Sequence, residues 1–192
     1  MTAIKERPIL FSAPMVRAIL EGRKTVTRRE VKKKAALDCL AAGFEPAFLA
    51  LPGNADLCPY GQTGDRLWVR ETWARIRVAQ APDQEWVVYR ESDNRTDYGG
   101  PWKPGIHMFR RDSRILLEIT DVRVERLQDI SRADIRAEGL QCPPEMASDD
   151  ASPNYRDWFP TAWQELWESI NGAGSWTTNP WVWVVEFKRV TP

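Results

Sequence analysis

Two spacings of hydrophobic residues recur along the chain, and each predicts a different kind of element. Short runs of alternating or β-branched residues predict strands, and apolar residues three or four positions apart predict amphipathic helices. Strands are expected at residues 5–11, 25–30, 64–73, 86–89, 114–126 and 181–187. Helices are expected at residues 12–21, 131–138 and 161–170. Because strands and helices do not alternate regularly, the pattern predicts a mixed α+β domain built around a barrel-like sheet.

Two of the predicted helices carry start and stop signals. Ser12 is a favourable N-cap for the helix at 12–21, and Gly22 ends that helix because glycine readily adopts a left-handed conformation. Ser131 begins a near capping box with Asp134 in the third helical position, and Gly139 ends that helix. Both helices are therefore expected to be short and sharply bounded.

The chain has 192 residues, which favours one domain over residues 1–192. The segments near 31–62, 77–104 and 141–157 interrupt the pattern and are interpreted as insertions. The first mixes an Ala- and Leu-rich helical piece with a loop. Residues 96–105 are rich in Gly and Pro and predict a loop, and residues 141–157 predict a mobile one.

The charge of the chain is balanced in total and uneven in distribution. The 27 Lys and Arg residues equal the 27 Asp and Glu residues, which argues against a protein that coats nucleic acid with its whole surface. Residues 1–34 nevertheless hold ten basic and three acidic side chains, a net of +7, so the remainder carries −7. A local basic surface can attract an anionic ligand, although the run 32–34 is also typical of a solvated face.

Cysteine and histidine restrict the chemistry further. The three Cys have no close spacing and predict neither a disulfide framework nor a zinc module, and the single His107 excludes a paired-histidine metal site. Without a glycine-rich phosphate loop, the sequence predicts no metal and no cofactor. No apolar run reaches the ~18 residues of a membrane span, and the first residues lack a signal-peptide core, so a cytoplasmic protein is expected.

Three segments together resemble a known family. The runs EGRKTVTRR (21–29), GDRLWVRETW (64–73) and VVEFKRV (184–190) look like the ASCH domain of the PUA-like superfamily, especially the longer ASCH proteins of phages and prophages. The resemblance covers roughly half of the chain. It implies a PUA-like small β-barrel with flanking short helices and long loop insertions, and a cleft beside the first helix that holds RNA or a nucleotide.

A small bacterial branch of that family hydrolyses the acetyl amide of N4-acetylcytidine, and the resemblance implies where its functional residues would lie. In the GRKTxT turn the matching residues are Lys24 and Thr27. The segment 127–138 aligns with a helix of the family without a gap and places Glu138 at its acidic position. The chains of that branch are much shorter than this one, so a different substrate is also open.

These residue types suit such chemistry. A lysine whose pKa is lowered in a partly desolvated cleft can act as a base or activate a threonine hydroxyl, and a carboxylate can relay the proton. Glu138 is expected in the last turn of its helix, where the helix dipole disfavours ionisation. In a regular strand Lys24 and Thr27 point to opposite faces, so they converge only if Lys24 still lies in the turn or a bulge intervenes.

Cations and aromatic residues provide further candidates for RNA contact. On the predicted strand 64–73, Arg66, Trp68 and Arg70 share one face and can bind phosphate and stack a base, although Trp68 can equally belong to the core. The complete set of predicted substrate- or RNA-binding residues is Arg23, Arg28, Arg29, Arg66, Trp68, Arg70 and Trp176.

The ten Trp divide between core and cleft. Core packing is the expected role for most of them, including Trp163 and Trp167 on the helix at 161–170. Trp176 and Trp181 are the preferred tryptophans for a cleft wall.

Three functions remain open from the residues. The first is hydrolysis of the amide of a modified cytidine by Lys24, Thr27 and Glu138. The second is a non-catalytic RNA-binding module whose arginines contact phosphate. The third is RNA cleavage in the same cleft. In all three the expected partner is a nucleoside or single-stranded RNA, with no membrane partner.

Overall fold

A computed structural model of the chain describes residues 3–78, 81–92, 101–144 and 158–190. Its central feature is a five-stranded sheet with the strand order β1-β3-β6-β7-β2. The strands are β1 (Glu6–Leu10), β2 (Val26–Glu30), β3 (Arg66–Arg70), β6 (Leu116–Arg126) and β7 (Trp181–Val190). β1 pairs with β3 in parallel, and the other three pairings are antiparallel. The mixed sheet with short helices confirms the predicted α+β class.

The described part of the sheet differs from the predicted barrel because it is open. β1 and β2 each have a hydrogen-bonded strand on one side only, so they form the two edges. A side chain spans the gap between them: Arg29 Nη2 on β2 donates to the carbonyl oxygen of Leu10 on β1 at 2.7 Å. The guanidinium of Arg29 also lies 5.3 Å from the ring centre of Phe11. The two edges are thus joined by a cation and not by a backbone ladder.

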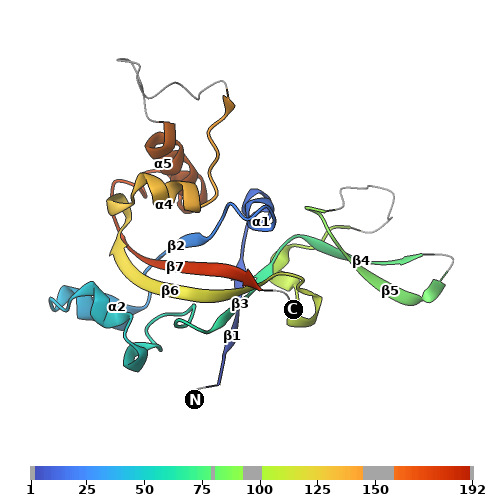
Figure 1. The fold of residues 1–192 in the computed structure, drawn as a ribbon, viewed down its shortest axis with the longest axis horizontal. Coiled ribbons are helices and arrows are strands. Elements are labelled where there is room, and N and C mark those ends of the chain that lie inside the picture. Colours follow the sequence, from blue (N-terminus) through green and yellow to red (C-terminus); the bar gives the residue numbers. More distant parts are fainter. Residues whose placement is uncertain (1–2, 79–80, 93–100, 145–157, 191–192) are drawn as a thin grey trace.

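Helices cover the sheet and connect its strands (Figure 1). The α-helices are α1 (Ala13–Leu20), α2 (Lys34–Ala41), α3 (Pro46–Leu49), α4 (Arg132–Ala137) and α5 (Trp158–Asn171). Short 3-10 turns lie at Pro52–Asn54, Gly105–His107, Arg110–Asp112 and Leu127–Asp129. Among the helices in these described ranges, none is long and apolar enough to cross a bilayer.

The predicted ends of α1 and α4 are confirmed, whereas the helix predicted over 161–170 runs from Trp158 to Asn171. Ser12 occupies the N-cap of α1 in an extended conformation, and Gly22 follows the helix at positive φ. Ser131 caps α4, because its side-chain oxygen accepts a hydrogen bond from Asp134 N at 3.1 Å. The predicted loop at 141–157 lies almost wholly outside the described residues.

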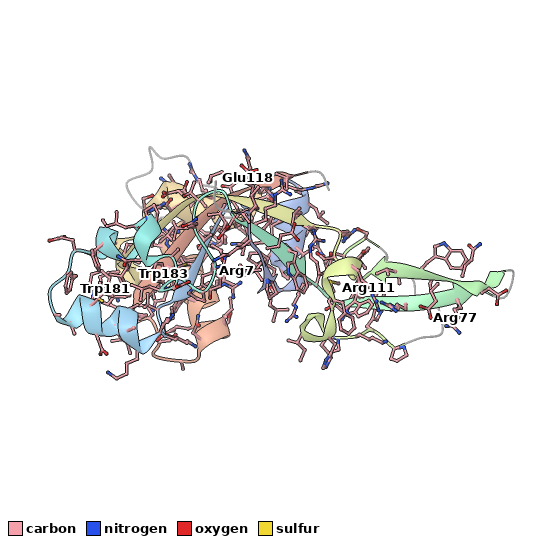
Figure 2. All side chains as sticks on the ribbon, turned by 90° about the horizontal axis from the view of Figure 1, so that it is seen from below. Arg7, Arg77, Arg111, Glu118, Trp181 and Trp183 are labelled. Carbon is pink, nitrogen blue, oxygen red and sulfur yellow. The ribbon has the colours of Figure 1, made fainter. Side chains whose placement is uncertain are left out.

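The single strand predicted over 64–73 is wrong, because the chain leaves the sheet after Arg70. Residues from Trp73 onward form β4 (Trp73–Val78), which pairs with β5 (Ala81–Tyr89) in a separate two-stranded sheet. This ribbon projects away from the central sheet (Figure 1), and Figure 2 shows Arg77 on the ribbon and Arg111 at its base.

Two tertiary contacts fix the break between β3 and β4. The buried carboxylate of Glu71 accepts from Arg114 Nε and Nη2, both at 2.9 Å. Gly105 packs so closely that an added Cβ would lie 3.1 Å from both Arg70 C and Glu71 N. Both partners are distant in sequence, so local β-propensity could not reveal the break.

The sheet separates two hydrophobic clusters through the alternation of β7. Trp183 and Val185 belong to the larger cluster on one face, whereas Val182 and Val184 pack with α4 and α5 on the other. Figure 2 shows Trp183 among the side chains that fill the body of the molecule. Because strand pairing aligns faces, Thr27, opposite Val185, shares the first face, and Arg28, opposite Val184, shares the second.

Candidate functional site

The turn between α1 and β2 lies against the C-terminal end of α4. Lys24 and Glu138 form an isolated antiparallel bridge, and Thr25 N donates to Ala137 O at 2.9 Å. Gly139, at φ +94°, allows this approach, since an added Cβ would lie 2.8 Å from Ala18 Cβ and 3.0 Å from Lys24 Cβ. The backbone therefore brings two segments more than 100 residues apart in sequence into direct contact.

Lys24 is completely buried and makes a full set of hydrogen bonds. Its Nζ donates to Val26 O at 2.8 Å, to Glu138 O at 3.0 Å and to Glu138 Oε2 at 2.6 Å. Desolvation lowers the pKa of Lys24, and the adjacent Glu138 carboxylate opposes that shift. An ammonium has three hydrogens, so in this arrangement all of them are donated.

The position of Lys24 also resolves the question of its orientation. β2 begins at Val26, and Lys24 precedes it in the turn. Strand alternation therefore does not restrict the direction of the Lys24 side chain, which points to Glu138.

Arg28 holds the Glu138 carboxylate from the opposite side. Its buried guanidinium donates to Glu125 Oε1 at 3.0 and 2.6 Å, lies 3.1 Å from Asp134 Oδ2, and donates to Glu138 Oε1 at 3.4 Å. Both carboxylate oxygens of Glu138 thus have a cationic partner, Lys24 and Arg28. The positive charge of Arg28 is therefore compensated by carboxylates within the protein.

A cavity of about 530 Å³ opens beside these residues; we call it the β2 cavity. Its lining comes from β2 and the residues after it, from α5, from α1 and from the segment before β3. The lining residues are Met15, Thr27, Arg28, Arg29, Glu30, Lys32, Lys33, Pro59, Tyr60, Glu138, Trp163, Leu166, Trp167, Ile170 and Asn171. Residues from both faces of β2 line it, so the cavity lies along the unpaired edge of that strand.

The hydrogen-bond pattern shows which backbone groups of β2 face this edge. Phe187 N donates to Thr25 O, and Val31 N donates to Trp181 O, so the odd-numbered residues between them exchange hydrogen bonds with β7. The peptide groups of Arg28 and Glu30 therefore point away from β7. Each presents one N–H and one C=O along the edge that borders the β2 cavity.

Two tryptophans in the lining of the cavity have no hydrogen-bond acceptor for their indole N–H among the described residues. Trp163 and Trp167 are each 3% exposed, and among the described residues neither indole N–H has a hydrogen-bond acceptor. A buried donor without a partner costs about 1–3 kcal/mol. Each indole nitrogen has less than 1 Å² of accessible surface, so these two residues line the cavity with the carbon atoms of their rings.

The structure brings together only part of the predicted site. Thr27, Arg28, Arg29 and Glu138 line the β2 cavity, and Lys24 lies directly behind Glu138. Arg23 instead donates to Gly139 O and pairs with Glu21.

The predicted binding residues on β3 lie outside the β2 cavity. Arg66, Trp68 and Arg70 are not among its lining residues, and the Arg70 guanidinium lies 4.8 Å from the ring centre of Trp68, which is buried. The aromatic face that suggested base stacking is thus covered by the neighbouring arginine.

The tryptophans divide differently from the prediction. Trp163 and Trp167 pack in the core as expected, and they also line the cavity. Trp176, predicted as a cleft wall, packs against the same core cluster, and Trp181 lies under the guanidinium of Arg126 at 4.1 Å. Neither is among the residues that line the β2 cavity.

Sequence reasoning missed Tyr60 and Met15 as lining residues. Tyr60 belongs to the segment 31–62 that was interpreted as an insertion, and it enters the cavity wall beside Pro59. Met15 lies in the helix predicted at 12–21, and helical periodicity alone does not show that its side chain borders a cavity.

Comparisons with known proteins give a likeness to solved structures. No family model matches the chain, and no curated protein matches it. A protein of the DUF984 family from Enterococcus faecalis V583 is similar at 10% identity and a TM-score of 0.44, over 100% of this chain and 83% of that one. An ASCH domain from Lactobacillus crispatus JV V101 is similar at 14% identity and a TM-score of 0.44, over 98% of this chain and 81% of that one. At these values neither likeness assigns a family or a ligand to this chain.

Proposed function

We propose that the protein binds a nucleoside-containing ligand, a nucleotide or short single-stranded RNA, in the β2 cavity. The observation that carries the proposal is the combination of groups around one space. A free strand edge, the aromatic rings of Trp163, Trp167 and Tyr60, and an excess of cations all border the same cavity. Its volume of about 530 Å³ lies in the range of small-molecule sites, about 300–1,000 Å³.

The strand edge suits the polar edge of a nucleobase. Outward-facing donors and acceptors of Arg28 and Glu30 lie two residues apart, which is about 7 Å along a strand. A base presents N–H and C=O groups in one plane and has apolar faces. The aromatic side chains of Trp163, Trp167 and Tyr60 provide apolar surface in the same cavity.

The cations suit a phosphate at the mouth of the cavity. Lys32 and Lys33 are exposed lining residues, and together with Arg28 and Arg29 they outnumber the lining carboxylates Glu30 and Glu138. The Arg28 charge is buried and paired, so the exposed lysines are the cations that a phosphate can reach. In the free protein Lys32 Nζ lies 3.6 Å from Glu30 Oε2 and Lys33 Nζ donates to the carbonyl oxygen of Asp56, and a phosphate would replace these contacts. Contacts of this kind weaken with salt.

The binding proposal is tested by titrating the protein with a short RNA and following tryptophan fluorescence. Lys33→Ala is expected to weaken binding several-fold, because it removes one phosphate contact. The matched control is Lys188→Ala, since Lys188 is exposed and pairs with Glu118 on β6, outside the cavity lining. Equal binding by all three proteins, or binding that does not change with salt, contradicts the proposal.

A second candidate function is hydrolysis of an exocyclic amide on such a ligand, for example N4-acetylcytidine. It is favoured by the carboxylate of Glu138 and the hydroxyl-bearing Thr27 in the lining of one cavity. Glu138 would take a proton from water as the water oxygen bonds to the amide carbon, and would return it to the nitrogen when the C–N bond breaks. Because the three Lys24 hydrogens are donated, Lys24 would position Glu138 and not act as the base.

This activity is tested by incubating the protein with N4-acetylcytidine and separating cytidine and acetate by chromatography. Turnover that is lost in Glu138→Gln and retained in Lys188→Ala supports hydrolysis. RNA fragments formed without added metal would indicate cleavage instead. A folded protein that binds RNA and leaves both substrates intact is a binding module.

A further inference from the structure

A second cavity, of about 520 Å³, adjoins the β2 cavity; we call it the α1–α5 cavity. The two share three lining residues, Met15, Glu138 and Leu166. The remaining lining residues of the α1–α5 cavity are Ser12, Pro14, Ala18, Gly139, Leu140, Trp158, Ala162, Glu165 and Ser169. Glu138 therefore borders two spaces of nearly equal volume.

The two cavities differ in charge. Four cationic side chains line the β2 cavity, whereas the described residues that line the α1–α5 cavity include no Lys and no Arg. The latter has the carboxylates of Glu138 and Glu165, the hydroxyls of Ser12 and Ser169, and otherwise apolar surface. A phosphate would be repelled there, and an uncharged planar group with an apolar face is favoured.

The partition between the cavities consists of side chains. Met15 and Leu166 are both half-buried and lie on different helices, α1 and α5. A methionine has three rotatable side-chain bonds and adapts readily to a neighbouring group. Together with Glu138, Met15 and Leu166 lie where the two spaces meet, and theirs are the side chains that would move to join them.

From this division we propose that the two cavities are successive subsites for two adjoining nucleotides of one single strand. The first nucleotide places its base in the β2 cavity and its phosphate beside Lys32 and Lys33. The neighbouring base enters the α1–α5 cavity, past Met15 and Leu166. This inference rests on the proposed function and extends it, because it makes a dinucleotide the smallest complete ligand.

The test compares a mononucleotide with a dinucleotide by calorimetry. UMP, the dinucleotide pUpU, and a pUpU analogue that lacks the second base are titrated into the same protein. The expected result is that pUpU binds about tenfold more tightly than UMP, the order of one additional stacked base. The analogue lacking the second base is expected to bind like UMP, which separates burial of the base from the added charge of its phosphate.

Variants test whether the additional affinity of pUpU over UMP comes from the α1–α5 cavity. Ala162→Leu adds volume to the α1–α5 cavity alone and is expected to bring the pUpU affinity to that of UMP, with UMP binding unchanged within twofold. The matched control Ala133→Leu changes an exposed residue of α4 outside both linings and is expected to keep the tenfold difference. Ser169→Phe, at an exposed lining position of the same cavity, repeats the test if Ala162→Leu does not fold.

The outcomes distinguish failure of the two-subsite inference from failure of the proposed function. If UMP binds and pUpU binds no better, the two-subsite inference is overturned and the proposed function stands. If Ala162→Leu weakens both ligands equally, the cavities are not separate subsites and the inference is again overturned. If neither ligand binds the wild-type protein, the proposed function itself fails.

Discussion

Replacing Glu138 by glutamine removes the charge that compensates a fully buried ammonium. Lys24 has Glu138 as its carboxylate partner, at 2.6 Å, and its other two acceptors are backbone carbonyls. Loss of one partner from a buried ion pair costs about 3–5 kcal/mol. Glutamine still provides an oxygen acceptor, so the lower end of that range is expected: Glu138→Gln should reduce the free energy of unfolding by about 3 kcal/mol.

A double-mutant cycle isolates the pair. Lys24→Met has a smaller effect, about 2 kcal/mol, because Glu138 keeps Arg28 as a cationic partner at 3.4 Å. In the double variant neither charge remains, so its loss should be smaller than the sum of the single losses by about 2 kcal/mol. Urea unfolding followed by circular dichroism measures all four proteins.

The pH dependence provides an independent check. Glu138 supplies both influences that raise the pKa of Lys24, and desolvation, the largest influence, lowers it from the ordinary 10.5. Without Glu138 the folded-state pKa of Lys24 falls further, while the unfolded value stays near 10.5. Between the two values the unfolded chain binds more protons, so stability rises with pH.

The deficit of Glu138→Gln should therefore shrink as the pH rises toward 10.5, the ordinary pKa of lysine. The double variant, which has no lysine at position 24, should show no such recovery. A deficit that stays constant with pH, or a double variant as unstable as the sum of the single ones, would refute a charged Lys24 paired with Glu138.

Three further predictions concern the surroundings of the site. Trp163→Phe and Trp167→Phe should leave stability within about 1 kcal/mol, because neither indole N–H has an acceptor among the described residues. Both variants should weaken RNA binding in fluorescence-anisotropy titrations, because the smaller ring removes apolar surface from the cavity wall; a stability loss with unchanged binding would contradict the role of these rings. Gly139→Ala should lower the free energy of unfolding, measured in urea, by more than about 2 kcal/mol, since the added Cβ meets Ala18 Cβ at 2.8 Å. The control Gly172→Ala, at a similar φ with open space around it, should lower it by only about 1 kcal/mol. Equal losses would show that the close contact is unimportant. The logarithm of the RNA affinity should fall linearly with the logarithm of the salt concentration. Lys33→Ala should make that slope shallower by about 0.7, the value for one phosphate contact on a single strand. An unchanged slope would place Lys33 away from the phosphates.

Local signals in the sequence account for most of the secondary structure. Ser131 and Gly139 fixed the ends of α4 because capping depends only on neighbouring residues. The alternation over 66–70 predicted a strand, and β3 spans those residues with Leu67 and Val69 buried. The break after Arg70 was missed because the residues that cause it, Arg114 and Gly105, are distant in the chain.

The candidate site was only partly accessible from sequence for the same reason. The family-like turn and helix identified Lys24 and Glu138, and the structure brings their side chains together. Base-stacking reasoning failed at Trp68, since interleaved cations and aromatics satisfy each other within one strand as readily as they bind a ligand. The role of Trp167 in the cavity wall depends on where the sheet ends, which helical periodicity does not encode.

The unpaired edge of β2 also has a consequence for the behaviour of the protein in concentrated solution. Exposed strand edges are templates for pairing with other chains and promote aggregation, so proteins commonly shield them. Here the edge borders a cavity walled by α5 and by the segment that carries Tyr60, which leaves room for a small ligand but hinders the approach of a second sheet. The elements that form the binding cavity thereby also hinder self-association through the edge of β2. A variant that loosens α5 is expected to lose solubility as well as ligand binding.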